Sequence, residues 1–586
     1  MTLPATHPDG DHAPLPTIPE APPAPVARPS RASRLRRLRR LLPALGIVLL
    51  VLLSSGTSLQ NGFAYDDVHI ISENPTVKKP AGWFRYFSQP YWPGKVAASL
   101  YRPLTVIGFA AQWKLGGGSP RLFHVVNVVL YTACSLAVFW LATLLLPPIA
   151  AWLVAALFAV HPVHVEAVGN IVGQAELAAA TALLSATAIY IRSRRDGRVP
   201  GVGASLAMLA LYAVACLVKE HGIVLPGLIA AAELTVVRDP RPWRDRVRTL
   251  RPLALALLMV GLAYLGVRSR NVSGLVGDVP HPAFIDLSTG RRWLTMLGVV
   301  PEWVRLLVWP AHLAADYSPP HIPIRDSLDV ASAVGALLLA AVFALAVALF
   351  RRAPVAAFGI FWVVVTLAPV SNFLFPTGIM LAERTLFLPS VGFLLVVGSA
   401  VPWLIDALRE QRPATRWLVV AAAAMLLAAG AWRSADRQRV WKDNDAIFGS
   451  LIEDSPLNFK SHFAYGGMQF VKGDYKTGER EWRIAIALLP EFAGVYVELG
   501  NKYREAHFCE PAIEVYRKAL AIEPGRAMAR AGLAACLLEL AQFEEARSQA
   551  RRGFAYGQVP ETFRYVSRVA DSVIVFRRDS AARARR

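Results

Sequence analysis

The chain has 586 residues, of which 54% are hydrophobic and only 18% are charged. A mean hydropathy of +0.39 is too apolar for a soluble enzyme of this length and indicates a protein with many membrane spans. The formal net charge of +20 does not indicate nucleic-acid binding, because the arginines gather between hydrophobic stretches and at the two ends, where they set membrane orientation.

The N-terminal segment is a basic leader followed by the first hydrophobic run. Residues 1–30 hold nine prolines and almost no large apolar side chains, and six arginines follow between Arg31 and Arg40. We therefore predict that residues 1–40 form a disordered, Pro/Arg-rich cytoplasmic leader. The uncharged run Leu41–Leu59 can span a bilayer. A cleaved signal peptide is the competing interpretation, but the long leader and the later spans favour a retained anchor.

Ten further hydrophobic stretches are long enough, or nearly so, to cross a membrane. They lie at about 123–146, 149–168, 175–191, 203–219, 222–237, 251–267, 330–350, 354–371, 387–405 and 416–433. The segment 293–310 holds Glu302 and Arg305, and we expect it to be re-entrant or interfacial. With the arginine-rich connections on the cytoplasmic side, the sequence predicts about eleven crossings in a membrane domain of residues 41–435. The C-terminal part and every unusual polar motif then lie on the non-cytoplasmic side.

The C-terminal part changes character after Trp441 and repeats with a period of 34 residues, which Pro456, Pro490 and Pro524 mark. The middle unit matches the tetratricopeptide pattern at Tyr496, Leu499, Gly500, Tyr503, Ala512, Tyr516, Ala519 and Pro524. We predict a linker at 436–454, an α-solenoid of about three tetratricopeptide repeats at 455–560 and a basic tail at 561–586. Such an array offers a concave face to an extended polypeptide.

The predicted fold class is therefore all-α, with a polytopic membrane domain followed by the repeat array. Four cysteines are present, and they form no CxxC pair and no His/Cys cluster, so we expect packing residues rather than a disulfide framework or a zinc site. They are Cys134, Cys216, Cys509 and Cys536.

Several ionisable residues lie at the ends of the predicted spans, where each costs about 2.5–3.5 kcal/mol to insert and is therefore a candidate functional group. They are Asp66, Asp67, Arg102, His161, His164, Glu166, Lys219, Glu220, His221, Glu383 and Arg384. Structural alternatives exist: a solvated turn at Asp66–Asp67, and a local charge pair between Lys219 and Glu220. The two histidines of HPVHVE are three residues apart, but Pro162 lies between them and no further ligand follows. No metal site is predicted, and the metal dependence stays open.

These motifs occur in a specific order along the chain. YDD at 65–67, YRPLT at 101–105, FHVVNVVLY at 123–131, HPVHVEAV at 161–168, KE at 219–220, DYS at 316–318 and PVSNFLFPTGIMLAERTLFLPSVGF at 369–393 precede the repeats. Over roughly residues 41–560 the chain closely resembles the transmembrane and tetratricopeptide-repeat-containing O-mannosyltransferase family, whose membrane half is similar to other GT-C glycosyltransferases. The Ala/Arg-rich composition favours a bacterial member, with its repeats in the periplasm; in a eukaryote the membrane would be that of the endoplasmic reticulum.

The resemblance implies transfer of a sugar, with mannose expected, from a polyprenyl-phosphate donor to protein Ser/Thr hydroxyls, with inversion and on the non-cytoplasmic face. The donor lipid is a substrate, and no cofactor is implied. Removing the hydroxyl proton requires a positioned carboxylate. Asp66 or Asp67 is the candidate base, and Glu166 and Glu383 are the next candidates.

Candidate residues also exist for binding the leaving phosphate and the acceptor polypeptide. The leaving phosphate gains charge that Arg102, Lys219 or Arg384 could stabilise. Tyr496 and Tyr503 are the candidate acceptor-binding residues of the array, which we expect to bind the protein substrate while the membrane spans carry out the chemistry.

Three positions depart from the family pattern, and they bear on the donor sugar more than on the chemistry. Gln174 stands where we expect a basic residue, and Thr385 and Phe387 stand where we expect tyrosines. The main alternative function is a non-catalytic, membrane-anchored tetratricopeptide scaffold for envelope proteins. A transporter of lipid-linked sugars is a third, but matching broken repeats are not evident in the sequence.

Overall fold

The structure is a computed structural model that describes residues 31–79, 82–93, 100–272, 281–284, 287–556 and 559–584. Helices and turns make up these ranges, and no strand occurs within them, so the predicted all-α fold class is confirmed. The chain divides into a short first unit that ends at Leu45 and a second unit, Gly46–Arg586.

Seven helical segments in the described ranges are long and apolar enough to cross a membrane. They lie in α1 (Arg31–Ser55), α4 (Pro120–Leu145), α7 (Gln174–Ser193), α10 (Trp243–Asn271), α13 (Val330–Leu349), α15 (Phe387–Arg409) and α16 (Pro413–Arg437). A further candidate is bent by 51° between α5 (Pro148–Val160) and α6 (Val165–Gly169). Shorter apolar helices are α8 (Val202–Val218), α9 (Leu225–Thr235) and α14 (Pro354–Leu367). The count of eleven crossings stays a prediction.

Two segments bear on the predicted boundaries. Helix α1 begins at Arg31, so the last ten residues of the predicted leader, 31–40, belong to this helix. Residues 1–30 lie outside the described residues. The ambiguous segment 293–310 forms α11 (Thr289–Leu297) and α12 (Val300–Val308), each of nine residues and too short to span a bilayer.

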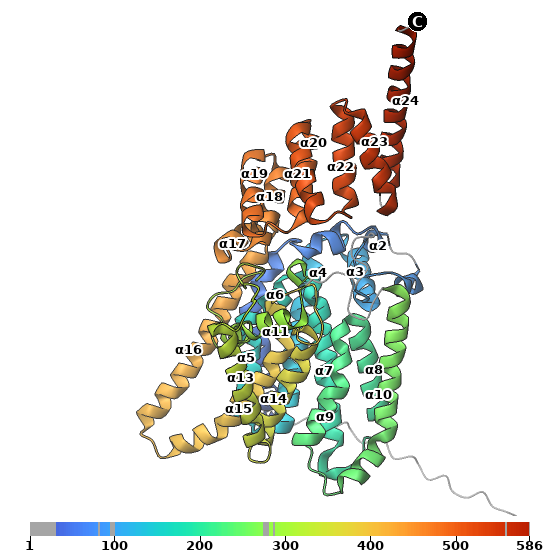
Figure 1. Cartoon of the computed structure of the whole chain (residues 1–586). Coiled ribbons are helices and arrows are strands. Elements are labelled where there is room, and N and C mark those ends of the chain that lie inside the picture. Colours follow the sequence, from blue (N-terminus) through green and yellow to red (C-terminus); the bar gives the residue numbers. More distant parts are fainter. Residues whose placement is uncertain are drawn as a thin grey trace, which may run out of the picture. The chain divides into compact units, whose positions relative to one another are not determined.

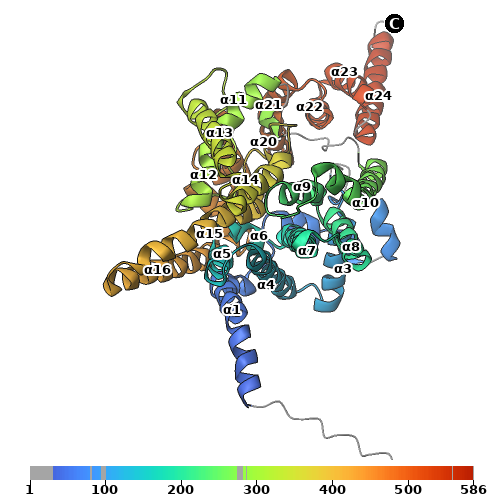
Figure 2. The same ribbon diagram turned by 90° about the horizontal axis from the view of Figure 1, so that it is seen from below.

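The bundle is assembled through close helix contacts. Helix α4 packs against α5 and α7, and α7 packs against α8, as the view from below shows (Figure 2). Helices α14 and α15 meet at two glycines: a Cβ at Gly359 would lie 2.5 Å from the Gly392 carbonyl oxygen. Only glycine permits this approach. Helices α13 and α16 expose large apolar side chains such as Phe343 and Trp417, as lipid-facing helices do.

Short helices and turns gather at the end of the bundle from which the array continues (Figure 1). They are η1 (Gly56–Gln60), η2 (Val68–Ser72), α2 (Pro75–Lys78), η3 (Trp83–Ser88), α3 (Pro103–Gly116), η4 (Pro162–His164), η5 (Ile171–Gly173), η7 (Glu220–Val224), η10 (Glu383–Leu386) and η11 (Gln438–Trp441). Most polar motifs of the sequence lie in or directly beside these segments, where regular spans are interrupted; YDD at 65–67 lies between η1 and η2, and DYS at 316–318 lies in the irregular segment after α12 (Val300–Val308).

The C-terminal part is a stack of helix pairs. After α17 (Asn444–Asp454) come the pairs α18 (Phe459–Lys472) and α19 (Tyr475–Leu488), α20 (Ala493–Glu505) and α21 (Cys509–Ile522), and α22 (Ala527–Glu539) and α23 (Phe543–Gly553). Within each of the first two pairs a glycine admits an aromatic ring: Gly466 meets Trp482, and Gly500 meets Tyr516. The four cysteines are buried and free, consistent with packing roles.

Most of the predicted basic tail at 561–586 forms helix α24 (Pro560–Ala584). It packs against α22 and α23 and buries Phe563, Val566 and Ile574. Apolar side chains at helical spacing, hidden in sequence among many arginines, give it one buried face.

Candidate functional site

The loop that carries the YDD motif is fixed against the segment that follows the last apolar helix. The Gly62 N–H donates to the Lys442 carbonyl at 2.7 Å, and the Tyr65 N–H donates to Asn444 Oδ1 at 2.7 Å. The ring of Tyr65 meets that of Trp441 edge-on. Tyr65 has φ +56°, a conformation that a bulky residue adopts only at a cost of about 1–3 kcal/mol. The surrounding contacts must therefore hold the loop in this shape.

Asp67 fastens the loop to the bundle. Its side chain is fully buried, and it accepts hydrogen bonds from the backbone N–H groups of Val172 at 2.9 Å, Ile171 at 3.2 Å and Ala64 at 3.4 Å. Burial raises the pKa of Asp67 to about 8, against the opposing effect of these donors. With both oxygens engaged, Asp67 is a structural residue and a poor candidate for the base.

Asp66 is in a different situation. It is half-buried and accepts no hydrogen bond from any residue that the structure describes. Burial raises the pKa of Asp66, and the positive charges of Arg384, His69, Arg102 and Lys460 oppose that rise without cancelling it. A carboxylate that is free of partners and has a raised pKa fits the requirements of a general base.

Arg102 is the first of three basic residues at the site, and its charge acts on Asp66. It lies at the start of α3, where its Nε donates to Glu220 Oε2 at 2.9 Å and its guanidinium lies 4.8 Å from the centre of the Tyr91 ring. Glu220 also accepts from the backbone N–H of Tyr101 at 3.2 Å. Glu220 and the Tyr91 ring thus hold Arg102 in place and leave part of its guanidinium group exposed at the site.

Lys219 and Arg384 complete the group of cations. Lys219 forms an ion pair with Glu176 at the start of α7. Arg384 forms an ion pair with Glu166, which also accepts its backbone N–H at 2.8 Å. Burial, together with the charges of Arg102 and Arg384, lowers the pKa of Lys219 well below its ordinary value. Because both arginines act on Lys219, the chain brings the three predicted phosphate-binding residues together.

Each cation keeps a small exposed part: 15% of the side chain for Arg102, 16% for Lys219 and 22% for Arg384. A guanidinium has five N–H donors, and one carboxylate does not use them all. Arg102 and Arg384 therefore keep N–H donors that their carboxylates do not use, and Lys219 keeps a small exposed part.

The two reserve candidates for the base are engaged elsewhere. Glu166 is buried and bound to Arg384, which gives it the role of orienting that residue. Glu383 is also buried, and its Oε1 accepts from the Ala314 N–H at 2.7 Å and from the Tyr317 hydroxyl at 3.0 Å. Burial raises the pKa of Glu383 to about 8, but its contacts hold it against Ala314 and Tyr317, whereas Asp66 has no such partner in the described residues.

The two tyrosines proposed to bind the acceptor differ in position. Tyr496 is only 8% exposed and belongs to the core of the array, so its predicted contact with an acceptor was wrong. Tyr503 is partly buried; its hydroxyl donates to Glu479 at 2.8 Å and accepts from Arg483 at 3.0 Å, beside a cavity of about 460 Å³. It can still contribute to a polar binding face.

The sequence marked Gln174 and Phe387 only as departures from the family pattern, and it gave no reason to select Gln112 or Asn444. Gln174, which stands where a basic residue was expected, pairs with Gln112 through amide contacts of 2.8 and 2.9 Å. Phe387 packs against His164 with ring centres 4.7 Å apart. Asn444, in the linker, was also missed, because nothing local marks a residue that binds a loop hundreds of positions away.

The histidines of HPVHVE are bound to protein groups. His161 Nε2 is 3.0 Å from the Leu307 carbonyl, and His164 Nε2 is 2.9 Å from the Ser390 hydroxyl. In the parts of the chain that the structure describes, no group of three His, Cys, Asp or Glu side chains is placed to hold a metal.

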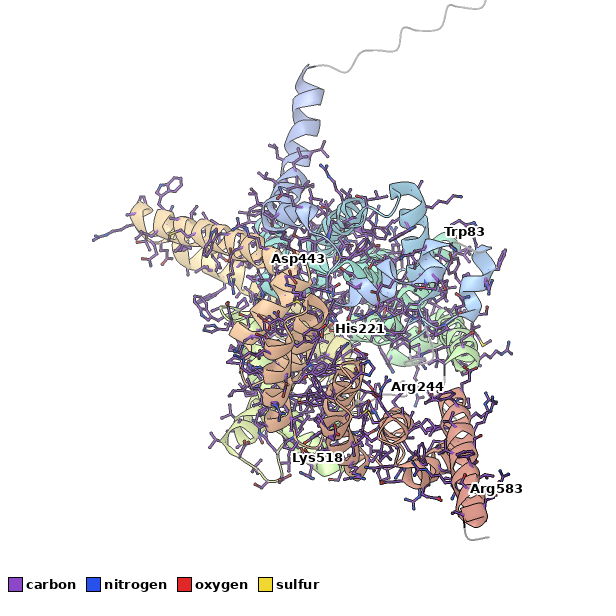
Figure 3. The ribbon with its side chains drawn as sticks, turned by 90° about the horizontal axis from the view of Figure 1, so that it is seen from above. Trp83, His221, Arg244, Asp443, Lys518 and Arg583 are labelled. Carbon is purple, nitrogen blue, oxygen red and sulfur yellow. The ribbon has the colours of Figure 1, made fainter. Side chains whose placement is uncertain are left out.

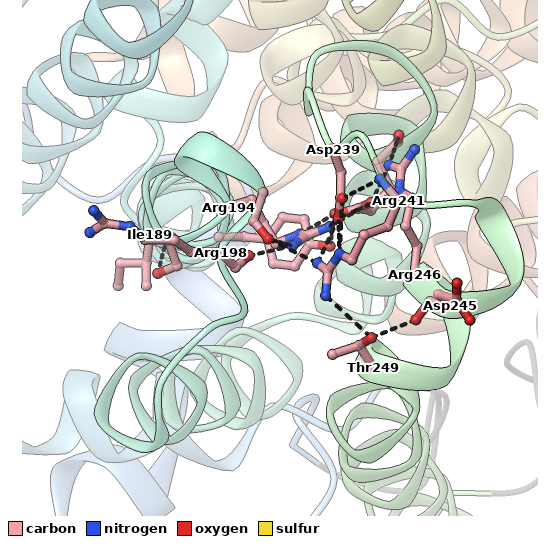
Figure 4. A network of polar contacts seen from close by, with 12 residues as sticks. Ile189, Arg194, Arg198, Asp239, Arg241, Asp245, Arg246 and Thr249 are labelled. Atoms are coloured by element: carbon pink, nitrogen blue, oxygen red, sulfur yellow. Dashed lines mark hydrogen bonds and ion pairs between the residues drawn. The ribbon is translucent and has the colours of Figure 1, made fainter.

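A second charged cluster joins the ends of α7 and α9 to the start of α10 (Figure 4). Arg194 binds Glu233 at 2.5 Å and Asp239 at 2.7 Å, and Arg246 also pairs with Glu233. Tyr190 donates to the same glutamate at 2.5 Å. Arg241 also pairs with Asp239, so three arginines and two carboxylates form an ion-pair network that joins these segments and has a structural role.

The fold and the site together define a helical, multi-span membrane protein with a charged site beside an appended tetratricopeptide array. The family model for the tetratricopeptide repeat matches residues 510–561. The chain is 28% identical to human protein O-mannosyl-transferase TMTC1 over 77% of its own length, 26% identical to mouse protein O-mannosyl-transferase TMTC3 over 82%, and 27% identical to human protein O-mannosyl-transferase TMTC4 over 72%.

These relatives confirm the resemblance to the transmembrane and tetratricopeptide-repeat-containing O-mannosyltransferases. The matches cover 56%, 54% and 63% of the three relatives, so the chain spans little more than half of their length.

Proposed function

We propose that this chain is a membrane glycosyltransferase that moves a sugar, with mannose expected, from a polyprenyl-phosphate donor to Ser/Thr hydroxyls of a protein acceptor. The observation that carries the proposal is the unpartnered carboxylate of Asp66 near the positive charges of Arg102 and Arg384, which also act on Lys219. The names of the relatives supply the reaction class, and the apolar helices fit a substrate with a lipid tail.

The proposed reaction is an inverting displacement. The acceptor oxygen attacks the anomeric carbon while Asp66 takes the hydroxyl proton, so a carbon–oxygen bond to the acceptor forms. The bond between the anomeric carbon and the phosphate oxygen breaks, and polyprenyl phosphate leaves with the electron pair. Arg102, Lys219 and Arg384 stabilise the charge that develops on this phosphate.

The repeats are proposed to bind the acceptor polypeptide on the same, non-cytoplasmic side, which is the periplasm in a bacterium and the lumen of the endoplasmic reticulum in a eukaryote. The contacts of Gly62 and Tyr65 with residues 442 and 444 support a common side for the YDD loop and the array. The arginine-rich connections support the orientation.

The test is transfer of radiolabel from polyprenyl-phosphate [³H]mannose to protein in membranes that contain this chain, with membranes containing the Asp66→Asn variant as the matched control. Label that appears in protein with the parent chain and is lost with the variant supports the proposal. Equal labelling with both chains would refute the role of Asp66. An absence of labelling with both, despite normal insertion, would favour the membrane-anchored scaffold.

A further inference from the structure

The first helix pair of the array reaches into the surroundings of the candidate site. Asn458, which caps α18, donates through Nδ2 to Asp316 Oδ1 at 2.8 Å and to the Asp316 carbonyl at 3.1 Å. Lys460 Nζ lies 3.6 Å from Asp316 Oδ2. The Phe459 N–H donates to the Pro319 carbonyl at 3.3 Å. Three successive residues of α18 and its cap thus hold the DYS segment at 316–318.

That segment lies against the YDD loop. Ala315 and Ala64, each next to a residue of these motifs, share a buried cluster with Trp441, Ile447 and Leu451. The negative charge of Asp316 acts on Tyr65, and the positive charge of Lys460 acts on Asp66. Lys460 of the array and Asp66 of the membrane part therefore interact electrostatically at the same site.

We infer that Lys460 is a positioning residue of the candidate site, which holds Asp316 beside the Tyr65–Asp66 loop and adds a positive charge that acts on the proposed base. This inference rests on the proposed function, and it makes the first repeat a part of the reaction site as well as a platform for the acceptor. The array and the spans then cannot be separated into a binding domain and a chemical domain.

The charges around the two carboxylates decide what a change at Lys460 should do. Asp66 faces Arg384, His69, Arg102 and Lys460, with Tyr65 and Asp67 beside it in the chain. Asp316 faces Lys460 and His281 as well as Tyr65. Burial acts to raise the pKa of Asp316, but Lys460 and the hydrogen bonds from Ser318 and Asn458 outweigh it, so the pKa lies below its ordinary value. Loss of Lys460 should raise the pKa of both carboxyls.

The test is the pH profile of donor hydrolysis without acceptor, and of transfer to protein, in the full-length chain. In Lys460→Gln the acid limb of both profiles should move to higher pH by about half a unit, the effect of one charge on the order of 10 Å away in half-solvated surroundings. The rate on that limb should fall about threefold, and Lys460→Arg should restore the parent profile. Lys518→Gln, which removes a cation paired with Glu514 on another part of the array (Figure 3), should leave the profile unchanged.

A second measurement does not depend on activity. A double-mutant cycle with Asp316→Asn and Lys460→Gln, followed by thermal unfolding, should show that the two changes are not additive. Additive shifts, or an unchanged acid limb in Lys460→Gln, would overturn the inference. Non-additive shifts in a chain without transfer or hydrolysis would instead keep the contact and refute the proposed function.

Discussion

Asp66 and Asp67 offer a direct test of the proposed base, because the same Asp→Asn substitution should reduce transfer at one position and stability at the other. In Asp66→Asn no hydrogen bond from a described residue is lost, so the fold should be retained. The proton acceptor is lost, and transfer should fall by about 10²–10⁴-fold, the usual contribution of a general base.

Asp67→Asn should act on stability. Both oxygens of Asp67 accept backbone N–H groups, and an amide can present only one oxygen. At least one buried N–H then faces an NH₂ group, at a cost of about 1–3 kcal/mol. Because folding raises the pKa of Asp67 from an ordinary 3.8 to about 8, the folded state binds the proton more tightly. The stability that this group contributes is complete below about pH 4 and is lost as the pH rises through 8, and Asp67→Asn should lack this dependence.

Thermal unfolding of the purified protein between pH 4 and 9 and single-turnover transfer from the labelled donor separate the two effects. The reasoning fails if Asp66→Asn turns over at the parent rate. It also fails if Asp67→Asn is as stable as the parent chain but inactive, since that would make Asp67 the base.

Three further predictions concern other parts of the molecule. Glu166→Gln should weaken donor binding about tenfold through misplacement of Arg384, measured as a higher KM for the donor lipid with a smaller change in kcat; an unchanged KM would contradict the orienting role. Arg194→Ala should cost about 1–3 kcal/mol of stability, because it removes a buried guanidinium that binds both Glu233 and Asp239 while Arg246 and Arg241 stay as their partners; the rate per folded molecule should stay the same, and a normal melting temperature would contradict a structural role for Arg194. Alkaline phosphatase fused after Arg586 should be active and the same enzyme inserted after Asp196 inactive, and the reverse pattern would place the array in the cytoplasm.

The parts of the fold that depend on local periodicity were predictable from the sequence. The 34-residue period gave the repeats, and the length of each apolar run gave the candidate spans. The helical structure of α24 was not predicted, because arginines separate its apolar residues along the sequence and only the helical spacing brings those residues onto one face.

The pairing of charges was not predictable, because it depends on contacts between distant segments. Arg384 and Glu166 are 218 residues apart, and Arg102 and Glu220 are 118 apart. The adjacent Lys219 and Glu220 looked like a local pair, yet each binds a residue elsewhere. Lys219 has an extended backbone, with φ −153° and ψ 140°, which turns neighbouring side chains to opposite sides.

This pattern of pairing also explains why the sequence could not separate Asp66 from Asp67. At the charged end of the bundle Arg102, Lys219 and Arg384 each have a carboxylate of their own, so these pairs add no net charge near the membrane. Asp67 is satisfied by backbone donors, and Asp66 is left with nearby positive charge but no partner in the described residues. An unmatched carboxylate near a bilayer destabilises the protein, so such a residue tends to be kept only where function requires it. The lack of a hydrogen-bond partner, which makes the Asp66 carboxylate energetically unfavourable, therefore also makes it the best candidate for accepting a proton from the substrate.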